Sequence, residues 1–148
     1  MNAQVSSAAA AAPRFIKIGE DGALLGADAT DWVAVLDTKQ NLMWDVEARP
    51  VNNYAGALKV PGKLTVFGFK DWRLPTVEEL FLLADRTRYR PAIDTDFFPD
   101  TPSDWFWTST LGASSPSGYA WFVDFNGGGS NWGGQGRGGF VRAVRPGQ

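Results

Sequence analysis

The chain has 148 residues and a formal net charge of −2, with 44% hydrophobic residues and a high aromatic share of 14%. This apolar content suffices for one folded domain and argues against intrinsic disorder. Cysteine and histidine are both absent, which excludes a disulfide framework, a Cys/His zinc site, a cysteine nucleophile and a Ser-His-Asp triad. The slight acidity disfavours nucleic acid as a partner, because phosphate contacts need clustered Lys and Arg.

Residues 1–13 are predicted to be a flexible leader that precedes one domain over residues 14–148. The leader contains an alanine run but neither the basic start nor the strongly apolar centre of a signal peptide. No segment is long and apolar enough to span a membrane. We therefore expect a cytoplasmic or virion-associated protein that spans no membrane.

The first third of the chain predicts three strands, the first from alternating polar and apolar residues and the other two from short apolar runs. These strands are expected at residues 14–18, 31–36 and 42–44. Turn-forming residues at 37–41 join the last two as a hairpin. Residues 51–58 are predicted to hold a short helix, which the following proline and glycine end.

The best local signal in the sequence is a capping box formed by Thr76 and Glu79. It predicts a helix from about Val77 to about Asp85. The apolar residues on one face of this helix are Val77, Leu80, Phe81 and Ala84.

The second half is predicted to consist of strands and long loops. An aromatic strand at residues 104–109 is followed by a loop at 112–118 and an alternating strand at 119–125. The glycine-saturated residues 126–139 are predicted to form a loop, and 140–145 a last strand. The residues expected to be largely buried are Trp44, Leu80, Phe81, Trp107, Trp121, Val123 and Val144.

Several motifs together resemble the Lcl C-terminal domain family, named after the C-terminal domain of a bacterial collagen-like adhesin. In chain order they are NLMW at residues 41–44, GFKDWRLPTVEEL at 68–80, PAID at 91–94, FFP at 97–99, WTST at 107–110, AWFVDF at 120–125 and FVRAVR at 140–145. The resemblance covers the chain from about residue 15 to its end. The order and spacing of so many motifs argue against chance agreement.

This resemblance implies an α+β, C-type-lectin-like fold with a twisted antiparallel sheet, one or two helices and long glycine-rich loops. The fold is similar to that of sulfatase-modifying enzymes and of the variable proteins of diversity-generating retroelements. The adhesin relative implies glycosaminoglycan binding and association into a trimer. The chain differs from the family pattern in a shortened first-helix region and in lacking a collagen-like stalk.

The loop predicted at residues 126–139 is the strongest candidate for a ligand-binding surface, because it sets recognition side chains among glycines. Trp is a rigid amphipathic anchor, Asn and Gln adapt their hydrogen bonds, and Arg pairs with anions. The proposed ligand-binding residues are Tyr119, Asn126, Ser130, Asn131, Trp132, Gln135 and Arg137. The alternative is a plain surface loop in which Trp132 folds back on the core.

Charge adds an expectation about the ligand. No acidic residue follows Asp124, whereas Arg137, Arg142 and Arg145 are all present. We therefore expect these arginines to be unopposed and the surface near the loop to be locally positive, which favours an anionic ligand.

Three other groups of polar residues are interpreted as structural. An Asp-Trp-Arg run at residues 71–73 can hold a loop ahead of the helix cap through an Arg–carboxylate pair and a buried indole. Four aspartates offer oxygens for calcium, but capping and turn roles suit them better. They are Asp94, Asp96, Asp100 and Asp104. The basic residues after the helix are interpreted as a solvated face that neutralises the helix C-terminus; they are Arg86, Arg88 and Arg90.

The function predicted from these residues is non-enzymatic recognition of a cell-surface carbohydrate or protein, as in a phage or prophage tail. No cofactor or metal is expected, and the aromatic content favours a homo-oligomer such as a trimer. The alternatives are a structural protein of a larger particle and an oxidase of the formylglycine-generating fold group. The absence of cysteine disfavours the oxidase, because those enzymes depend on active-site cysteines.

Overall fold

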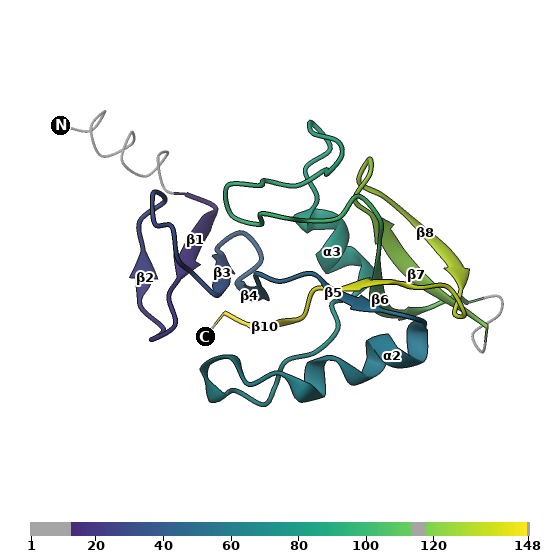
Figure 1. Cartoon of the computed structure of the whole chain (residues 1–148). Coiled ribbons are helices and arrows are strands. Elements are labelled where there is room, and N and C mark those ends of the chain that lie inside the picture. The colour runs from purple at the N-terminus through teal and green to yellow at the C-terminus, as the bar shows by residue number, and fades with distance from the viewer. Residues whose placement is uncertain (1–12, 114–117, 148) are drawn as a thin grey trace.

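The computed structural model describes residues 13–113 and 118–147 (Figure 1). The predicted leader, apart from Pro13, and most of the predicted loop at residues 112–118 lie outside the described residues. The chain forms two five-stranded sheets with few helices, an α+β arrangement compatible with the predicted C-type-lectin-like fold.

The first sheet is built mainly from the N-terminal part of the chain and is antiparallel throughout. Its strands, in spatial order, are β10 (Val144–Pro146), β4 (Leu42–Asp45), β3 (Ala34–Asp37), β1 (Phe15–Ile18) and β2 (Leu24–Leu25). The strands predicted at residues 14–18, 31–36 and 42–44 correspond to β1, β3 and β4. The predicted hairpin turn joins β3 to β4.

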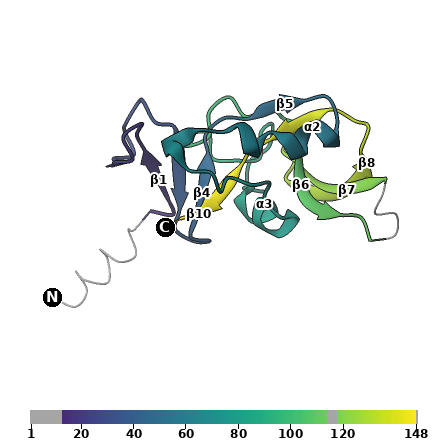
Figure 2. The ribbon, with the colours of Figure 1, turned by 90° about the horizontal axis from the view of Figure 1, so that it is seen from below.

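The second sheet holds the C-terminal strands and places β8 at one edge, at the end of the molecule opposite β1 and β2 (Figures 1 and 2). Its strands, in spatial order, are β5 (Arg49–Val51), β9 (Gly139–Val141), β6 (Trp105–Leu111), β7 (Tyr119–Asp124) and β8 (Gly129–Gly134). Only the β6–β9 pair among these neighbours is parallel. The main core cluster joins the two sheets, since Val35 and Trp44 of the first pack with Phe106 and Val123 of the second.

The strand predicted at residues 140–145 is in fact two strands, because the chain passes there from the second sheet to the first. Arg142 lies at the crossing and is completely buried. Its Nη1 donates to the carbonyl oxygens of Asp45 at 3.0 Å and Val46 at 2.6 Å, where the chain leaves β4. Its Nη2 donates to Thr101 Oγ1 at 2.9 Å. Arg142 thereby connects the crossing segment to the end of β4 and to Thr101.

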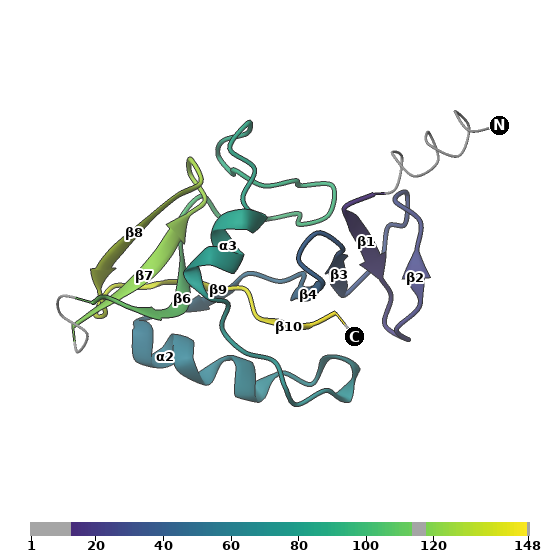
Figure 3. The same ribbon diagram turned by 180° about the vertical axis from the view of Figure 1, so that it is seen from behind.

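Two helices cover the second sheet from opposite sides (Figures 1 and 3). The helices are α2 (Tyr54–Lys59) and α3 (Val77–Leu83), with 3-10 turns η1 (Pro61–Lys63) and η2 (Val66–Gly68) between them. Leu80 of α3 packs in one core cluster with Phe106 and Val123. Tyr54 of α2 packs in a second core cluster with Trp107 and Phe122. These two residues are the sequence neighbours of Phe106 and Val123, so their side chains lie on the other face of the sheet.

Both helices were predicted, and their starts are determined by side-chain caps. Asn53 accepts from the backbone N–H of Gly56 at 2.9 Å, so α2 begins after it and not at residue 51, which belongs to β5. Thr76 accepts from the backbone N–H of Glu79 at 3.2 Å, and Glu79 accepts in return from the N–H of Thr76 at 2.9 Å. The capping box is therefore formed as predicted.

The predicted core is confirmed for five of its seven residues. Those five, Trp44, Leu80, Trp107, Val123 and Val144, are buried. Phe81 and Trp121 are only half-buried. These two side chains line the same surface groove, which is described below.

Candidate functional site

Residues 126–139, predicted to be a loop, contain the edge strand β8. The strand pairs with β7 from Asp124 opposite Gly129 to Tyr119 opposite Gly134. The prediction failed because glycines carry no side-chain alternation, while their backbone groups pair as well as any other residue's. Gly128 closes the turn before β8 with a φ of 87°, and its N–H donates to the carbonyl of Asp124 at 2.8 Å.

Strand alternation divides the predicted ligand-binding residues between two faces of the β7–β8 hairpin. Tyr119, Ser130 and Trp132 lie on the face toward α3, together with Trp121, the register partner of Trp132. Asn131 lies on the opposite face, opposite Phe122. The structure therefore does not bring all the predicted residues together.

The face toward α3 carries an exposed aromatic pair. The rings of Tyr119 and Trp132 meet edge to face with centroids 4.9 Å apart. Tyr119 is 36% and Trp132 42% exposed, so the indole is not folded into the core. Gln135 donates from Nε2 to the carbonyl of Tyr119 at 3.1 Å and thereby ties the end of β8 to β7. We call Tyr119 and Trp132 the aromatic pair.

Beside the aromatic pair, α3 and the hairpin enclose a groove of about 550 Å³. Its lining residues are Val77, Glu78, Phe81, Leu82, Thr110, Trp121 and Ser130. We call this the α3 groove. Leu82 is 43% exposed although it is apolar, and Thr110 Oγ1 accepts from the backbone N–H of Val77 at 3.1 Å. A largely apolar groove with a few polar groups is the usual character of a ligand site.

On the opposite face of the hairpin, aromatic packing borders an open hollow of about 470 Å³ whose lining includes Trp105, Phe122 and Asn131. The rings of Trp105 and Phe122 stack with centroids 3.6 Å apart and an interplanar angle of 8°. The guanidinium of Arg137 lies 3.7 Å from the centroid of the Trp105 ring and pairs with Asp104 at 3.1 Å. A Cβ on Gly133 would come within 2.6 Å of the Trp105 ring, so glycine is required there for packing.

The expectation that the C-terminal arginines are unopposed is wrong, because partners come from distant parts of the chain. Arg137 pairs with Asp104, and Arg145 donates to both carboxylate oxygens of Asp71, at 2.7 and 3.1 Å. Arg142 is buried, and that burial lowers the pKa of its guanidinium to about 10. The predicted positive surface beside the hairpin is therefore not formed by these three arginines.

Among the remaining predicted residues, Asn126 and Asn131 serve the hairpin itself. Asn126 is exposed in the turn, where its backbone N–H donates to Asp124 Oδ1 at 2.9 Å and its carbonyl accepts from the backbone N–H of Arg90 at 2.9 Å. The side chain of Asn131 accepts from the backbone N–H of Trp132 at 2.8 Å. That bond occupies one of the outward N–H groups of the edge strand.

A model of the Lcl C-terminal domain family matches residues 33–145, which include α2, α3, the hairpin and most of both sheets. The chain belongs to this family. The family is adhesin-like, which implies that the domain binds an external partner. No curated protein matches the chain.

The Asp-Trp-Arg motif of this Lcl C-terminal domain has the structural role predicted for it. Trp72 is buried, and Asp71 pairs with Arg145. Arg73 forms a two-pronged pair with Glu79, at 2.8 and 2.9 Å. Burial would raise the pKa of Glu79, but the bonds from Arg73 and the Thr76 N–H outweigh it and hold the pKa below its usual value. The motif anchors the start of α3.

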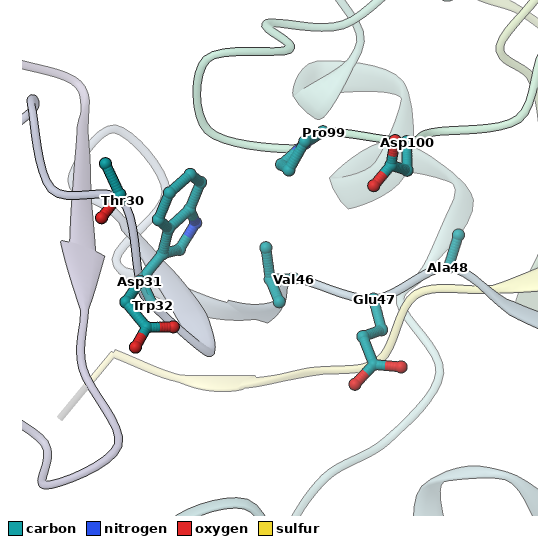
Figure 4. Close-up of a pocket in the computed structure, with 8 residues that line it drawn as sticks. All are labelled: Thr30, Asp31, Trp32, Val46, Glu47, Ala48, Pro99 and Asp100. Atoms are coloured by element: carbon teal, nitrogen blue, oxygen red, sulfur yellow. The ribbon is translucent and has the colours of Figure 1, made fainter.

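A second hollow, of about 360 Å³, lies between the first sheet and the segment that contains Pro99 (Figure 4). Trp32 and Asp100 lie on opposite sides of it, and Asp31 and Glu47 add carboxylates. Within residues 13–113 and 118–147 no three acidic side chains gather closely enough to hold a metal ion. Of the aspartates considered for calcium, Asp94 and Asp104 accept backbone N–H groups of neighbouring residues, a turn role.

Sequence reasoning missed most of the α3 groove, since Val77 and Phe81 were assigned to a buried helix face. One feature of the sequence could have indicated the groove: Leu82 lies beside the buried face of the helix, so an apolar side chain is left exposed next to Glu78.

None of the helices in the described part of the chain is long and apolar enough to cross a membrane.

Proposed function

We propose that this Lcl C-terminal domain is a non-catalytic recognition module that binds a cell-surface carbohydrate on the α3 side of the β7–β8 hairpin. One observation carries the proposal: the aromatic pair is exposed on a hairpin whose two strands are held together by sheet pairing and by the Gln135 contact. A pyranose ring presents a face of C–H groups, which packs on an exposed aromatic ring without any change in the protein.

The surroundings of the aromatic pair also suit a sugar. Ser130 and Glu78 offer hydroxyl and carboxylate oxygens within the α3 groove, and hydroxyl-rich ligands need such acceptors. The rigid hairpin limits the conformational entropy lost on binding. We therefore propose Tyr119, Ser130, Trp132 and Gln135 as the part of the predicted set that meets the ligand.

A glycan array and a whole-cell binding assay test this function. The domain should bind a subset of glycans, and binding to bacteria should fall when periodate oxidises the surface sugars. Trp132→Ala should weaken binding by about tenfold or more, as for an interface hot spot, whereas Tyr89→Ala should not. Tyr89 is the matched control because it is 73% exposed and lies outside the hairpin.

Binding that survives periodate and disappears after protease treatment of the cells would identify a protein ligand instead and would contradict the carbohydrate proposal. Equal binding by Trp132→Ala and the parent protein would place the site elsewhere on the domain.

We also propose that the domain associates with itself, in a trimer or another homo-oligomer. The support is the number of large apolar side chains left exposed on the described surface. They include Leu24, Leu58, Phe69 and Leu111. Light scattering at micromolar concentrations should give a multiple of the 16.1 kDa chain mass, and a monomer mass throughout would refute the proposal.

A further inference from the structure

The α3 groove continues the surface of the aromatic pair without a break in the sheet. Trp121, in its wall, is the register partner of Trp132, and Ser130 lies two residues from Trp132 along the same face of β8. A ring stacked on Trp132 therefore projects its substituents or the next sugar toward the groove. The side chains that line the groove therefore determine which ligands fit.

From these walls we propose that the α3 groove binds the acetamido group of an uncharged N-acetylated saccharide whose ring stacks on Trp132. This inference rests on the proposed carbohydrate-binding function. It adds the ligand class and a second group of contact residues.

The apolar part of the groove fits a methyl group. Val77, Phe81 and Leu82 form one wall from α3, and Trp121 forms the facing wall from β7. Leu82 is 43% exposed and has apolar surface to lose to a ligand. A sugar that carries only hydroxyl groups would place polar groups against this apolar wall. The methyl of an acetamido group instead packs on the wall and removes apolar surface from water.

The polar part of the groove fits the N–H and O–H groups of such a sugar. Neither Glu78 nor Ser130 forms a side-chain hydrogen bond or an ion pair within the described part of the chain, so both oxygens are free to accept. Thr110 Oγ1 already accepts from the N–H of Val77, which leaves its hydroxyl proton free to donate to a carbonyl. An amide supplies one donor and one acceptor, which match these groups.

The charges around the groove favour an uncharged ligand. Glu78 is the charged residue of the lining, and a sulfate or carboxylate placed there would meet its negative charge. Arg86 is not one of the lining residues, although its guanidinium lies 3.7 Å from the centroid of the Phe81 ring. It donates to the carbonyls of Gly128 at 2.6 Å and Phe81 at 2.7 Å, and these bonds hold its guanidinium over the Phe81 ring.

The dimensions of the groove favour a sugar over a helical peptide. The α3 wall runs from Val77 to Leu82, a rise of about 7.5 Å. A docked amphipathic helix needs apolar wall for two turns, about 11 Å, to receive its anchors at i, i+3/i+4 and i+7.

Calorimetric titration of the whole chain with three oligosaccharides tests the inference. The probes are chitotetraose, which is β-1,4-linked N-acetylglucosamine; cellotetraose, which has the same linkage without acetamido groups; and a heparin tetrasaccharide, which is sulfated. Chitotetraose should bind about tenfold or more tightly than cellotetraose. Its affinity should change less than about twofold between about 50 and 500 mM NaCl, because no ion pair forms.

Variants separate the groove from the aromatic pair. Leu82→Ala should weaken chitotetraose binding about fivefold or more and leave cellotetraose unaffected. Leu58→Ala is the control, since Leu58 is a comparably exposed helical leucine, 56% exposed on α2. Trp132→Ala should weaken both sugars.

Equal affinity for chitotetraose and cellotetraose, with both lost in Trp132→Ala, would overturn the groove inference and leave the proposed function standing. Tightest binding to the heparin tetrasaccharide, weakened steeply by salt, would also overturn it. If no sugar binds here or on the array and Trp132→Ala leaves cell binding unchanged, the proposed function fails as well.

Discussion

The two faces of the β7–β8 hairpin are made from the same two strands, and they differ in what covers them. Toward α2, which we call the closed face, Arg137 covers the Trp105 ring of the Trp105–Phe122 stack and is itself paired with Asp104. Toward α3, the aromatic pair is open to solvent and adjoins the α3 groove. Both faces are rich in aromatic rings, so composition alone does not distinguish them; they differ in whether another side chain covers the rings.

The largest expected effect comes from adding a methyl group to the closed face. In Gly133→Ala the new Cβ would lie 2.6 Å from the Trp105 ring and 3.1 Å from Phe122. The Trp105 ring is held between Phe122 and Arg137, so the strain is expected to lower the free energy of unfolding by about 1–3 kcal/mol. Thermal and urea unfolding measure this loss.

Gly129→Ala is the matched control for that variant. Gly129 lies on the same strand, a Cβ added there would meet no atom within 4 Å, and its backbone is not in the left-handed region. Its stability should stay within about 0.5 kcal/mol of the parent. Equal effects of the two substitutions would mean that the Trp105 stack does not constrain β8.

The sequence predicts those elements of the fold that are determined by neighbouring residues, and it fails for those that depend on distant residues. Strand β1 follows from alternation, β3 and β4 follow from short apolar runs joined by turn-forming residues, and α3 follows from its capping box. Strand β8 was missed because its pairing is determined by β7. The partner of Arg137, Asp104, is 33 positions away, and the carbonyl of Asp45 that Arg142 meets is 97 positions away. No spacing rule predicts contacts at such separations.

The same distinction applies to the candidate site. Tyr119 and Trp132 were named from composition, and the structure places them side by side. The sequence did not predict that Asn131 and Arg137 lie on the other face of the hairpin from Tyr119 and Trp132. That separation follows only once β8 is known to be a strand, because neighbouring residues of a strand point to opposite faces. The α3 groove could not be predicted, because it forms only when α3 packs against the hairpin, and neither segment determines that packing alone.

Acid should weaken the attachment of α3, the helix that borders the open face. Burial raises the pKa of Asp37, but bonds and charge from Arg14, with donors from Trp44 and Gln40, hold it below its usual value. Arg14 also donates to the carbonyl of Leu82 at 3.0 Å. The pKa of Glu79, at the start of α3, is likewise lowered, against the effect of its burial, by Arg73 and by bonds with Thr76.

A carboxyl whose folded pKa is below its unfolded pKa stabilises the fold above the unfolded value and loses that contribution as pH falls. The free energy of unfolding should therefore be nearly constant from about pH 7 to 5 and decline below about pH 4, near the unfolded pKa values of Asp and Glu. Urea midpoints measured against pH test this. Asp37→Asn should lower stability at about pH 7 and flatten the decline, because the carboxylate that titrates is gone; an unchanged pH profile would contradict the assignment.

A smaller effect is expected from removing the cover of the closed face. Arg137→Ala takes away an exposed ion pair and a cation–π contact, which together should lower stability by about 1 kcal/mol or less. Part of the loss should disappear in high salt, because the ion pair is screened there. A loss of several kcal/mol would show that Arg137 supports the Trp105 stack far more than an exposed pair can.

The most direct test of the account compares Trp132→Ala with Arg137→Ala in one titration series, using a glycan that the parent domain binds. Trp132→Ala should lose about tenfold or more in affinity, with an almost unchanged melting temperature. Arg137→Ala should keep its affinity within about twofold, with a slightly lower melting temperature. The reverse pattern, in which Arg137→Ala loses binding and Trp132→Ala retains it, would place the ligand on the opposite face of the hairpin and contradict the assignment of the aromatic pair.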